Sequence, residues 1–480
     1  MDSSVQEKLQ SRSYYKWLIF IIVATGTFMG TMTASIVSVG LPPITAALQT
    51  DIATAQWVVT AYLLVITSLL PLMGRLGDIL GRRKMYGFGF VGFTVGSLLC
   101  GVAGSISLLI GFRVLQAIGI SALMANAMAF VTSNFPRNER GKALGMIGTI
   151  VALGSLSGPG LGGLLIEHFG WHSIFFVNLP VGLLGYAGVK LILPHDRDRQ
   201  QEKIDYFGAV LFMAGMVSFL LVLSYGTHWG WTSFATIACL AFALLVFIAF
   251  IRYEQKIDYP MLELSIFKNW AFTAGNLAGC LSFVAMFINT MLLPFFLYDV
   301  LAFSPAKTGL VMSAFPLVMA ISAPVSGALS DKVGFVTLTT VGLGLMSLGL
   351  VLTANLYQDA TLWLIIGSQA LMGLGNGLFQ SPNNNSVMSS VPSRQLGVAG
   401  GINALSRNFG MICGAALSVS ILEYRRSVSL SGLSQPTAGQ QTAAFMTGYH
   451  EALLVGACLA ALGVLISFKR SASRQNRNSD

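Results

Sequence analysis

The sequence predicts an all-α polytopic membrane protein with both ends of the chain in the cytoplasm. Three observations lead there: the overall composition, the recurrence of long apolar runs, and the positions of the basic residues. Of the 480 residues, 54% are hydrophobic and only 10% are charged, whereas a soluble domain carries about 25% charged residues. So few charges cannot cover the surface of a soluble protein of this size.

Apolar runs long enough to cross a bilayer recur fourteen times between residues 17 and 468. A helix needs about 20 apolar residues to span the hydrocarbon core, and it satisfies its own backbone hydrogen bonds in lipid. The first run, from Trp17 to Gly40, is too long for the apolar part of a cleavable signal peptide. We therefore expect fourteen transmembrane helices in the cell membrane.

The basic residues set the expected orientation of these helices. Of the 28 Lys and Arg residues, 23 lie in the two terminal segments and in alternate loops, and three lie in the intervening loops. The positive-inside rule places the basic loops and both termini in the cytoplasm. The net charge of +9 is thus explained by topology, and no nucleic-acid partner is expected.

The chain contains an internal repeat. The pattern of residues 71–81 recurs at 324–334, and that of 136–141 recurs at 392–397, with offsets of 253 and 256. Both pairs fall on expected cytoplasmic loops, which indicates two parallel halves with a transport site between them. The expected domains are a six-helix half at 1–193, a linker with two extra helices at 194–270, and a second six-helix half with a cytoplasmic tail at 271–480.

Several motifs, in the right order, resemble those of the major facilitator superfamily. Residues 74–84 (GRLGDILGRRK) resemble its loop 2–3 signature, and residues 113–119 resemble its fourth-helix motif. Residues 154–163 resemble the fifth-helix motif associated with antiporters, while 56–62 and 171–180 are similar to the fourteen-helix drug:proton antiporter branch. The resemblance covers nearly the whole chain. It implies the major facilitator fold, a small-molecule substrate, protons as the coupling ion, and a monomer in the lipid bilayer.

The resemblance also implies a gating role for the loop around Asp78. This acid follows a helix end beside Arg75, Arg82 and Arg83, so a cytoplasmic charge network would lock one conformation; a solvated loop is the alternative. A kink in the fifth helix would let the halves rock, although close packing of small residues explains its composition equally. The gating candidates are Gly74, Asp78, Gly81, Arg82, Arg83, Gly158, Pro159 and Asp331.

The first expected helix departs from the pattern of the branch. Thr33 stands where the branch commonly has an acid, and Ser38 stands where it has an amide. None of the 19 acidic residues lies clearly at mid-membrane, whereas Arg113 and Arg407 fall inside expected helices. Because a proton-coupled exporter of cations usually needs a buried carboxylate, we expect neutral or anionic substrates. Coupling would then use Asp299, a peripheral acid such as Asp78, or a titrating group of the substrate.

Polar side chains at membrane depth supply further candidates, because each is costly unless it is bonded or faces water. Bonding between helices is the alternative explanation for each of them. The substrate and coupling candidates are Thr33, Trp57, Tyr62, Arg113, Gln116, Asn289, Tyr298, Asp299, Asn376 and Arg407. Residues 382–385, Pro-Asn-Asn-Asn, are expected to break their helix, and the basic C-terminal tail that includes Arg470 is expected to anchor the last one.

These features favour a secondary transporter that exports organic compounds by alternating access in exchange for protons. The first alternative is uptake of one neutral or anionic, vitamin-like nutrient by the same fold. The second is a scaffold or sensor that transports nothing, against which the cytoplasmic loops are short. Neither a G-x-x-x-x-G-K-[ST] loop nor an H-E-x-x-H pair occurs, so we expect no ATP-driven pump, no enzyme, no metal and no cofactor.

Overall fold

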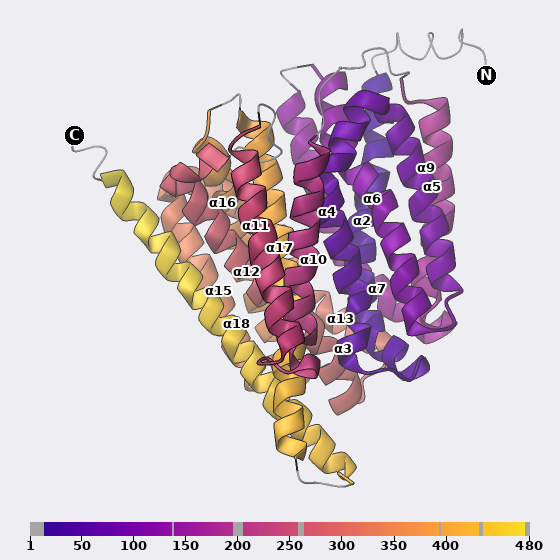
Figure 1. The fold of residues 1–480 in the computed structure, drawn as a ribbon, viewed down its shortest axis with the longest axis vertical. Coiled ribbons are helices and arrows are strands. Elements are labelled where there is room, and N and C mark those ends of the chain that lie inside the picture. The colour runs from indigo at the N-terminus through magenta and orange to yellow at the C-terminus, as the bar shows by residue number, and fades with distance from the viewer. Residues whose placement is uncertain are drawn as a thin grey trace. The chain divides into compact units, whose positions relative to one another are not determined.

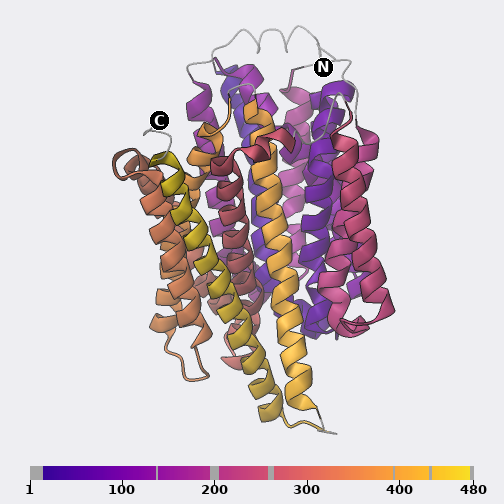
Figure 2. The ribbon, with the colours of Figure 1, turned by 60° about the vertical axis from the view of Figure 1, so that its left-hand side comes forward.

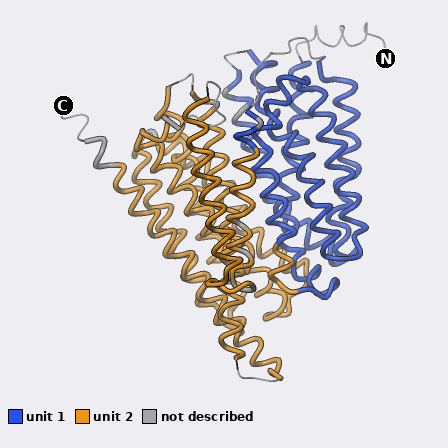
Figure 3. The backbone as a smooth tube through the Cα atoms, in the orientation of Figure 1, with its two compact units in different colours: residues 1–50, 57–209 blue, residues 51–56, 210–480 orange. Residues whose placement is uncertain are grey.

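The computed structural model describes residues 14–136, 139–194, 205–257, 264–392, 395–431 and 435–475. All regular elements within these ranges are helices (Figure 1). The chain forms two compact units, shown in Figure 3: unit 1 comprises residues 1–50 and 57–209, and unit 2 comprises residues 51–56 and 210–480. Each unit is described by itself below.

Unit 1 contains the helices of the first half of the chain. They are α2 (Tyr15–Ala47), α4 (Trp57–Leu80), α5 (Arg82–Gly101), α6 (Ile106–Asn134), α7 (Arg140–Phe169), α8 (Ser173–Phe176) and α9 (Asn178–Leu191).

Unit 2 holds the remaining elements. They are α3 (Ile52–Ala55), most of α10 (Tyr206–Trp229), α11 (Phe234–Glu254), η1 (Leu264–Lys268), α12 (Trp270–Phe295), the π-turn η2 (Phe296–Val300), α13 (Pro305–Met312), α14 (Ala314–Val333), α15 (Phe335–Ala354), α16 (Leu362–Ser389), α17 (Leu396–Leu430) and α18 (Ala438–Gln475).

Capping side chains and glycines determine where several of these helices begin and end. The side chain of Ser105 accepts a hydrogen bond from the third backbone N–H of α6, and Asn269 does the same for α12, which satisfies amides that have no partner within the helix. Gly81 and Gly334 have φ of 103° and 88°, a region that glycine enters without strain. Helices α4 and α14 therefore turn sharply into α5 and α15.

Within the described residues, twelve helices are long and apolar enough to cross a membrane. Helices α5 and α10 fall outside this set. Three basic residues and five glycines make α5 less apolar, although it has 20 residues and packs along α6. The all-helical membrane fold is thus confirmed, while the count of fourteen and the cytoplasmic termini stay predictions.

The two units repeat one pattern of helix packing. In unit 1, α2 packs on α7, α6 on α4 and α5, and α9 on α5; in unit 2, α12 packs on α17, α16 on α14 and α15, and α18 on α15. These pairings match the internal repeat seen in the sequence. Residues 210–254 group with unit 2, and their assignment as an insertion between two halves stays a prediction.

Close approach of α7 to α2 depends on three glycines. Cβ atoms added at Gly154, Gly158 and Gly162 would lie 2.1, 1.9 and 2.6 Å from side-chain atoms of α2, so only glycine permits this distance between the helices. Pro159 lies inside α7, which continues through it to Phe169. Close packing therefore accounts for this motif, and its role in conformational change stays a prediction.

The expected break of the helix at residues 382–385 is wrong. Helix α16 runs continuously from Leu362 to Ser389. Pro382 has no N–H for the carbonyl of Leu378, one turn earlier, and the hydroxyl of Ser326 on α14 donates to that carbonyl instead, at 3.0 Å. The neighbouring helix thus replaces the missing bond, which removes the main penalty of a proline at this position.

The last two helices are longer than a bilayer requires. Helices α17 and α18 have 35 and 38 residues, or about 50 to 60 Å at 1.5 Å per residue, against a hydrocarbon core of about 30 Å. They pack along each other within unit 2 (Figure 2). An ion pair between Arg425 and Glu451 joins them. Part of this helical hairpin therefore lies beyond the apolar core.

Candidate functional site

A fully buried arginine is the centre of a polar cluster in unit 1. Arg113 on α6 is 0% exposed. Its Nε donates to the carbonyl of Val58 on α4 at 2.8 Å, and its Nη1 donates to Oε1 of Gln116 at 2.5 Å. The guanidinium lies 3.8 Å from the ring centre of Tyr62, also on α4, an attractive cation–π arrangement. Charge-assisted bonds and an aromatic face thus compensate for the missing hydration of this charge.

The cluster extends to a third helix and leaves two groups without partners. Nε2 of Gln116 donates to the hydroxyl of Ser97 on α5 at 2.7 Å, so the cluster links α4, α5 and α6. Within the described structure, Nη2 of Arg113 and the hydroxyl of Tyr62 are buried and make no hydrogen bond. Because buried polar groups are rarely left unbonded, these two atoms are candidates to bind water or a solute.

Unit 2 has a neutral counterpart of this cluster. With the offset of 256 found in the repeat, Arg113 corresponds to Gln369 on α16 and Ser97 to Thr353 on α15. Asn289 on α12 donates to Gln369 at 2.8 Å, and Gln369 donates to Thr353 at 3.4 Å. Amides and a hydroxyl thus replace the charge, so this cluster can bind both donors and acceptors of a neutral solute. The repeat offset alone identifies Gln369 as the counterpart of Arg113.

Thr33, which stands where the similar antiporters commonly have an acid, makes a hydrogen bond between two neutral side chains. The hydroxyl of Thr33 on α2 donates to Oδ1 of Asn178, at the start of α9, at 3.2 Å, and both side chains are 0% exposed. Ser38, one turn further along α2, is buried, and its hydroxyl has no partner in the described residues. Neither position carries a proton-binding carboxylate.

The described carboxylates lie in loops, near helix ends, or in ion pairs. Asp78 precedes the end of α4 by two residues, Glu254 ends α11, and Asp299 lies in the η2 turn after α12. Glu139 pairs with Lys16 at 2.5 Å, and Glu451 pairs with Arg425. Among the described residues, no group of three metal-binding side chains occurs.

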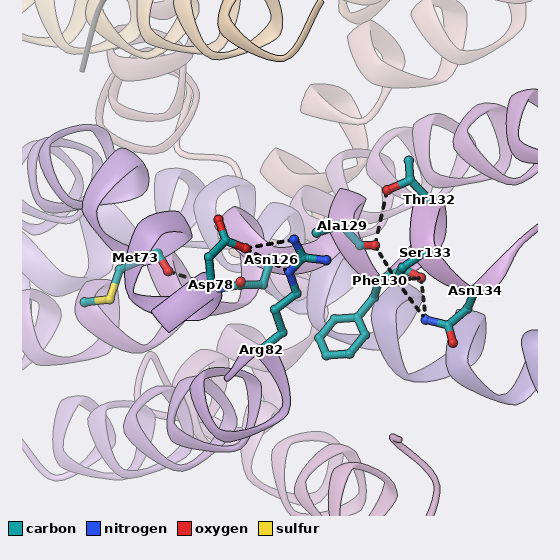
Figure 4. A network of polar contacts seen from close by, with 9 residues as sticks. All are labelled: Met73, Asp78, Arg82, Asn126, Ala129, Phe130, Thr132, Ser133 and Asn134. Carbon is teal, nitrogen blue, oxygen red and sulfur yellow. Dashed lines mark hydrogen bonds and ion pairs between the residues drawn. The ribbon is translucent and has the colours of Figure 1, made fainter. Parts of the chain in front are cut away.

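The loop signature forms a charge contact at the junction of α4 and α5. Nε and Nη2 of Arg82 donate to Oδ1 of Asp78 at 3.0 and 2.8 Å (Figure 4). Arg83 donates to the carbonyl of Lys190 at the end of α9 at 2.6 Å. Gly81 supplies the positive φ between the two helices. The expected contact of Asp78 with basic neighbours is thus present for Arg82, while the side chain of Asp331 lies outside the described residues.

Asn126 on α6 holds the end of α4 immediately before Asp78, as Figure 4 shows. Its Nδ2 donates to the carbonyl of Met73 on α4 at 3.2 Å and to that of Ala122 at 2.9 Å. A Cβ atom at Gly77 would lie 1.9 Å from Oδ1 of Asn126. The side chain therefore occupies the space that the glycine leaves and fixes the position of the junction between α4 and α5. The only sequence signal for this contact is the glycine that precedes Asp78.

Arg470 has a role that the sequence analysis did not predict. It was expected in a cytoplasmic tail, but it lies in α18 and is 3% exposed. Its Nη1 donates to Oδ1 of Asn383 at 2.8 Å, and its Nη2 donates to Ser386 at 2.7 Å, both on α16. The guanidinium also lies 5.2 Å from the ring centre of Phe335 on α15. It therefore joins three helices of unit 2.

The remaining candidates lie on α4, α16, α17 and η2. Trp57 is buried at the start of α4, and Asn376 on α16 donates only to the sulfur of Met286, at 3.5 Å. Tyr298 lies in η2, next to Asp299, and Arg407 is partly buried on α17. A Cβ atom added at Gly74 would make one ordinary contact, with Cβ of Ala125 at 3.9 Å.

The chain is similar to a family of membrane transporters over most of its length. The family model described as Major Facilitator Superfamily matches residues 23–275, 206–415 and 275–479. The chain is 35% identical to "Riboflavin transporter RibZ" of Clostridioides difficile, over 94% of this chain and 97% of that protein. It is 31% identical to "Multidrug transporter protein MdtP" of Bacillus subtilis, over 83% of this chain and 74% of that protein.

One solved structure confirms the fold. The POT family transporter PepTSo aligns with a TM-score of 0.69, over 95% of this chain and 98% of that one, at 16% identity. A similarity at this level of identity concerns the fold alone.

Proposed function

Because the chain belongs to the Major Facilitator Superfamily and is a multi-pass transporter of the cell membrane, we propose that it takes up a flavin or a closely similar neutral or anionic ring compound. Transport proceeds by alternating access of one binding site. The chain carries no enzymatic activity, since its relatives are transporters.

The observation that carries this proposal is the chemistry of the buried polar groups. In unit 1 they are Arg113 and neutral hydroxyls and amides; in unit 2 the central cluster is formed by Asn289, Thr353 and Gln369. No described carboxylate is a member of either cluster. A permanently cationic drug needs a counter-charge in the low-dielectric interior, whereas the carbonyl and imide edges of a flavin need donors and acceptors such as amides. The similarity to a riboflavin transporter over nearly the full length of both chains supports the same substrate class.

Proton-linked efflux of several organic compounds is the second candidate. It is favoured by the glycine-rich packing of α7 on α2, whose motif resembles that of antiporters, and by the similarity to proteins named as multidrug transporters. In this case Asp299 or Asp78 is the proposed coupling group. For both candidate functions we propose a monomer with cytoplasmic termini and fourteen membrane helices. These are the twelve helices that are apolar enough to span, together with α5 and α10.

Uptake by a riboflavin-auxotrophic bacterium without its own flavin transporter tests the choice between the candidates. Cells that produce the chain are expected to grow on low riboflavin and to accumulate labelled riboflavin above cells with an empty vector. Reduced accumulation of several unrelated dyes, abolished by a protonophore, would instead establish efflux. Ethidium, a permanently cationic dye, is included for comparison with riboflavin. It is expected to be transported poorly, because neither buried polar cluster contains a described carboxylate to pair with its charge.

A further inference from the structure

An arginine inside a membrane helix of unit 2 makes no contact that would compensate its charge. Arg407 lies on α17, in the apolar segment Val398–Leu430, about 14 Å from the start of that segment at 1.5 Å per residue. It is partly buried. Across the described ranges it makes no hydrogen bond, ion pair or ring contact. A guanidinium keeps its charge and offers five N–H donors, so this position is costly without a partner.

Other arginines of the same unit have partners. Arg425 pairs with Glu451 and Arg426 with Glu423, and Arg470 donates to two side chains of α16. The contrast makes Arg407 a partly buried cation of unit 2 without a counter-charge among the described residues.

Amide side chains of α16 and α17 extend the polar surface that begins at Arg407. Asn403 lies one turn earlier on α17, hence on the same face of the helix. Its Nδ2 donates to Oδ1 of Asn384 on α16 at 3.0 Å, and this bond is exposed. The two N–H donors of Asn384 remain without a recorded partner in the described structure. Gln380, one turn before Asn384, adds a further partly buried amide.

This surface has the properties of a wet binding site for an electron-rich group. Exposed amides on membrane helices are expected to border water rather than lipid, because an unbonded polar group in hydrocarbon costs several kcal/mol. Donors outnumber acceptors on this surface, because the guanidinium of Arg407 has five N–H groups and no acceptor. A carboxylate or phosphate satisfies both the charge of Arg407 and the spare donors.

We propose that Arg407, Asn403 and Asn384 form a subsite that binds an anionic oxygen group of the transported solute. The inference rests on the proposed transport function and adds to it the class of solute, an organic anion. The subsite gives anionic solutes an advantage over neutral solutes that share the same ring.

Riboflavin and flavin mononucleotide are a matched pair of probes, because they differ by one phosphate. Binding to the purified full-length protein in lipid nanodiscs is followed by quenching of flavin fluorescence. We expect the mononucleotide to bind at least about tenfold more tightly at low ionic strength, an advantage that shrinks as salt screens the charges. Arg407→Gln is expected to bring the two affinities within about twofold of each other, and Arg407→Lys to keep part of the difference.

Two further variants separate a loss of the site from a loss of the fold. Asn403→Asp places a carboxylate one turn from Arg407, in the order that favours pairing, and is expected to abolish the preference while leaving riboflavin binding. The double variant Arg425→Gln, Glu451→Gln removes an ion pair that includes an arginine of the same helix, and is expected to leave the preference intact. Equal affinities in the native protein, or an unchanged preference in Arg407→Gln, would overturn the proposal.

A second pair of probes makes the subsite testable without flavins. If neither flavin binds, the proposed substrate class is wrong, and benzoate and benzamide then test the subsite alone. Benzoate is expected to raise the melting temperature of the native protein more than benzamide does, and to lose this effect in Arg407→Gln. Equal effects of the two compounds on the native protein would show that no anionic subsite exists there.

Discussion

Replacing Gly77 by alanine tests the contact that holds the junction of α4 and α5. The added Cβ would lie 1.9 Å from Oδ1 and 2.8 Å from Cγ of Asn126, whereas ordinary contact begins at 3.4 Å. Asn126 cannot turn away freely, because its Nδ2 bonds the carbonyls of Met73 and Ala122. Either these bonds break or α4 moves away from α6, and both outcomes displace the neighbouring Asp78.

The expected cost follows from these two terms. Overpacking a tight helix contact costs about 1 to 3 kcal/mol, and each lost hydrogen bond contributes about 1 kcal/mol. We therefore expect Gly77→Ala to destabilise unit 1 by about 2 to 4 kcal/mol. At about 2 °C per kcal/mol for a unit of this size, the melting temperature falls by about 4 °C or more.

Reaction of Cys100 with a thiol-specific fluorophore during heating reads out the unfolding of unit 1, because this thiol is buried on α5. The four cysteines of unit 2 are replaced by serine so that only this unit reports. Gly74→Ala is the matched control. Its Cβ would meet only Ala125 at 3.9 Å, and alanine is the better helix former, so no loss of stability is expected.

A second substitution identifies Asn126 as the cause. Asn126→Ala removes the colliding atoms, so the double variant with Gly77→Ala is expected to recover at least half of the stability lost in the single variant. A melting temperature unchanged by Gly77→Ala, or no recovery in the double variant, would refute the role assigned to this contact.

Three further predictions concern transport. Arg113→Met removes the bonds to Val58 and Gln116 and is expected to lower the uptake rate at least about tenfold at equal membrane expression; an unchanged rate would make this arginine purely structural. Asp78→Asn abolishes the charge contact with Arg82, so we expect slower transport with an unchanged substrate affinity, and a change in affinity alone would contradict gating. Thr33→Asp supplies the missing buried acid and is expected to permit transport of ethidium, whereas no gain would count against the role of this position in charge selection.

The sequence predicted the class of fold because that class depends on composition and spacing. The long apolar runs became the helices, and the repeat offset matched the packing of α6 on α5 and of α16 on α15. The contact between Asp78 and Arg82 was also foreseeable, because the acid lies within five residues of three arginines at a helix end.

Contacts between distant helices were not predictable in the same way. The bond that keeps α16 continuous through Pro382 joins Ser326 to Leu378, 52 positions apart, and the residues around the proline give no sign of it. Arg470 was taken for a tail residue because α18 continues past its apolar segment. The partners of Asn126 carried no local signal, since a buried amide pairs with any carbonyl that a neighbouring helix presents.

Substrate exchange by the purified protein in liposomes tests whether the transport site accepts a flavin and rejects a permanent cation. Liposomes loaded with unlabelled riboflavin are diluted into labelled riboflavin or into labelled ethidium, with and without an imposed proton gradient. We expect labelled riboflavin to accumulate by exchange and excess unlabelled riboflavin to compete with it. Ethidium is expected not to accumulate. Exchange of ethidium without exchange of riboflavin would contradict a transport site formed by neutral groups and arginine.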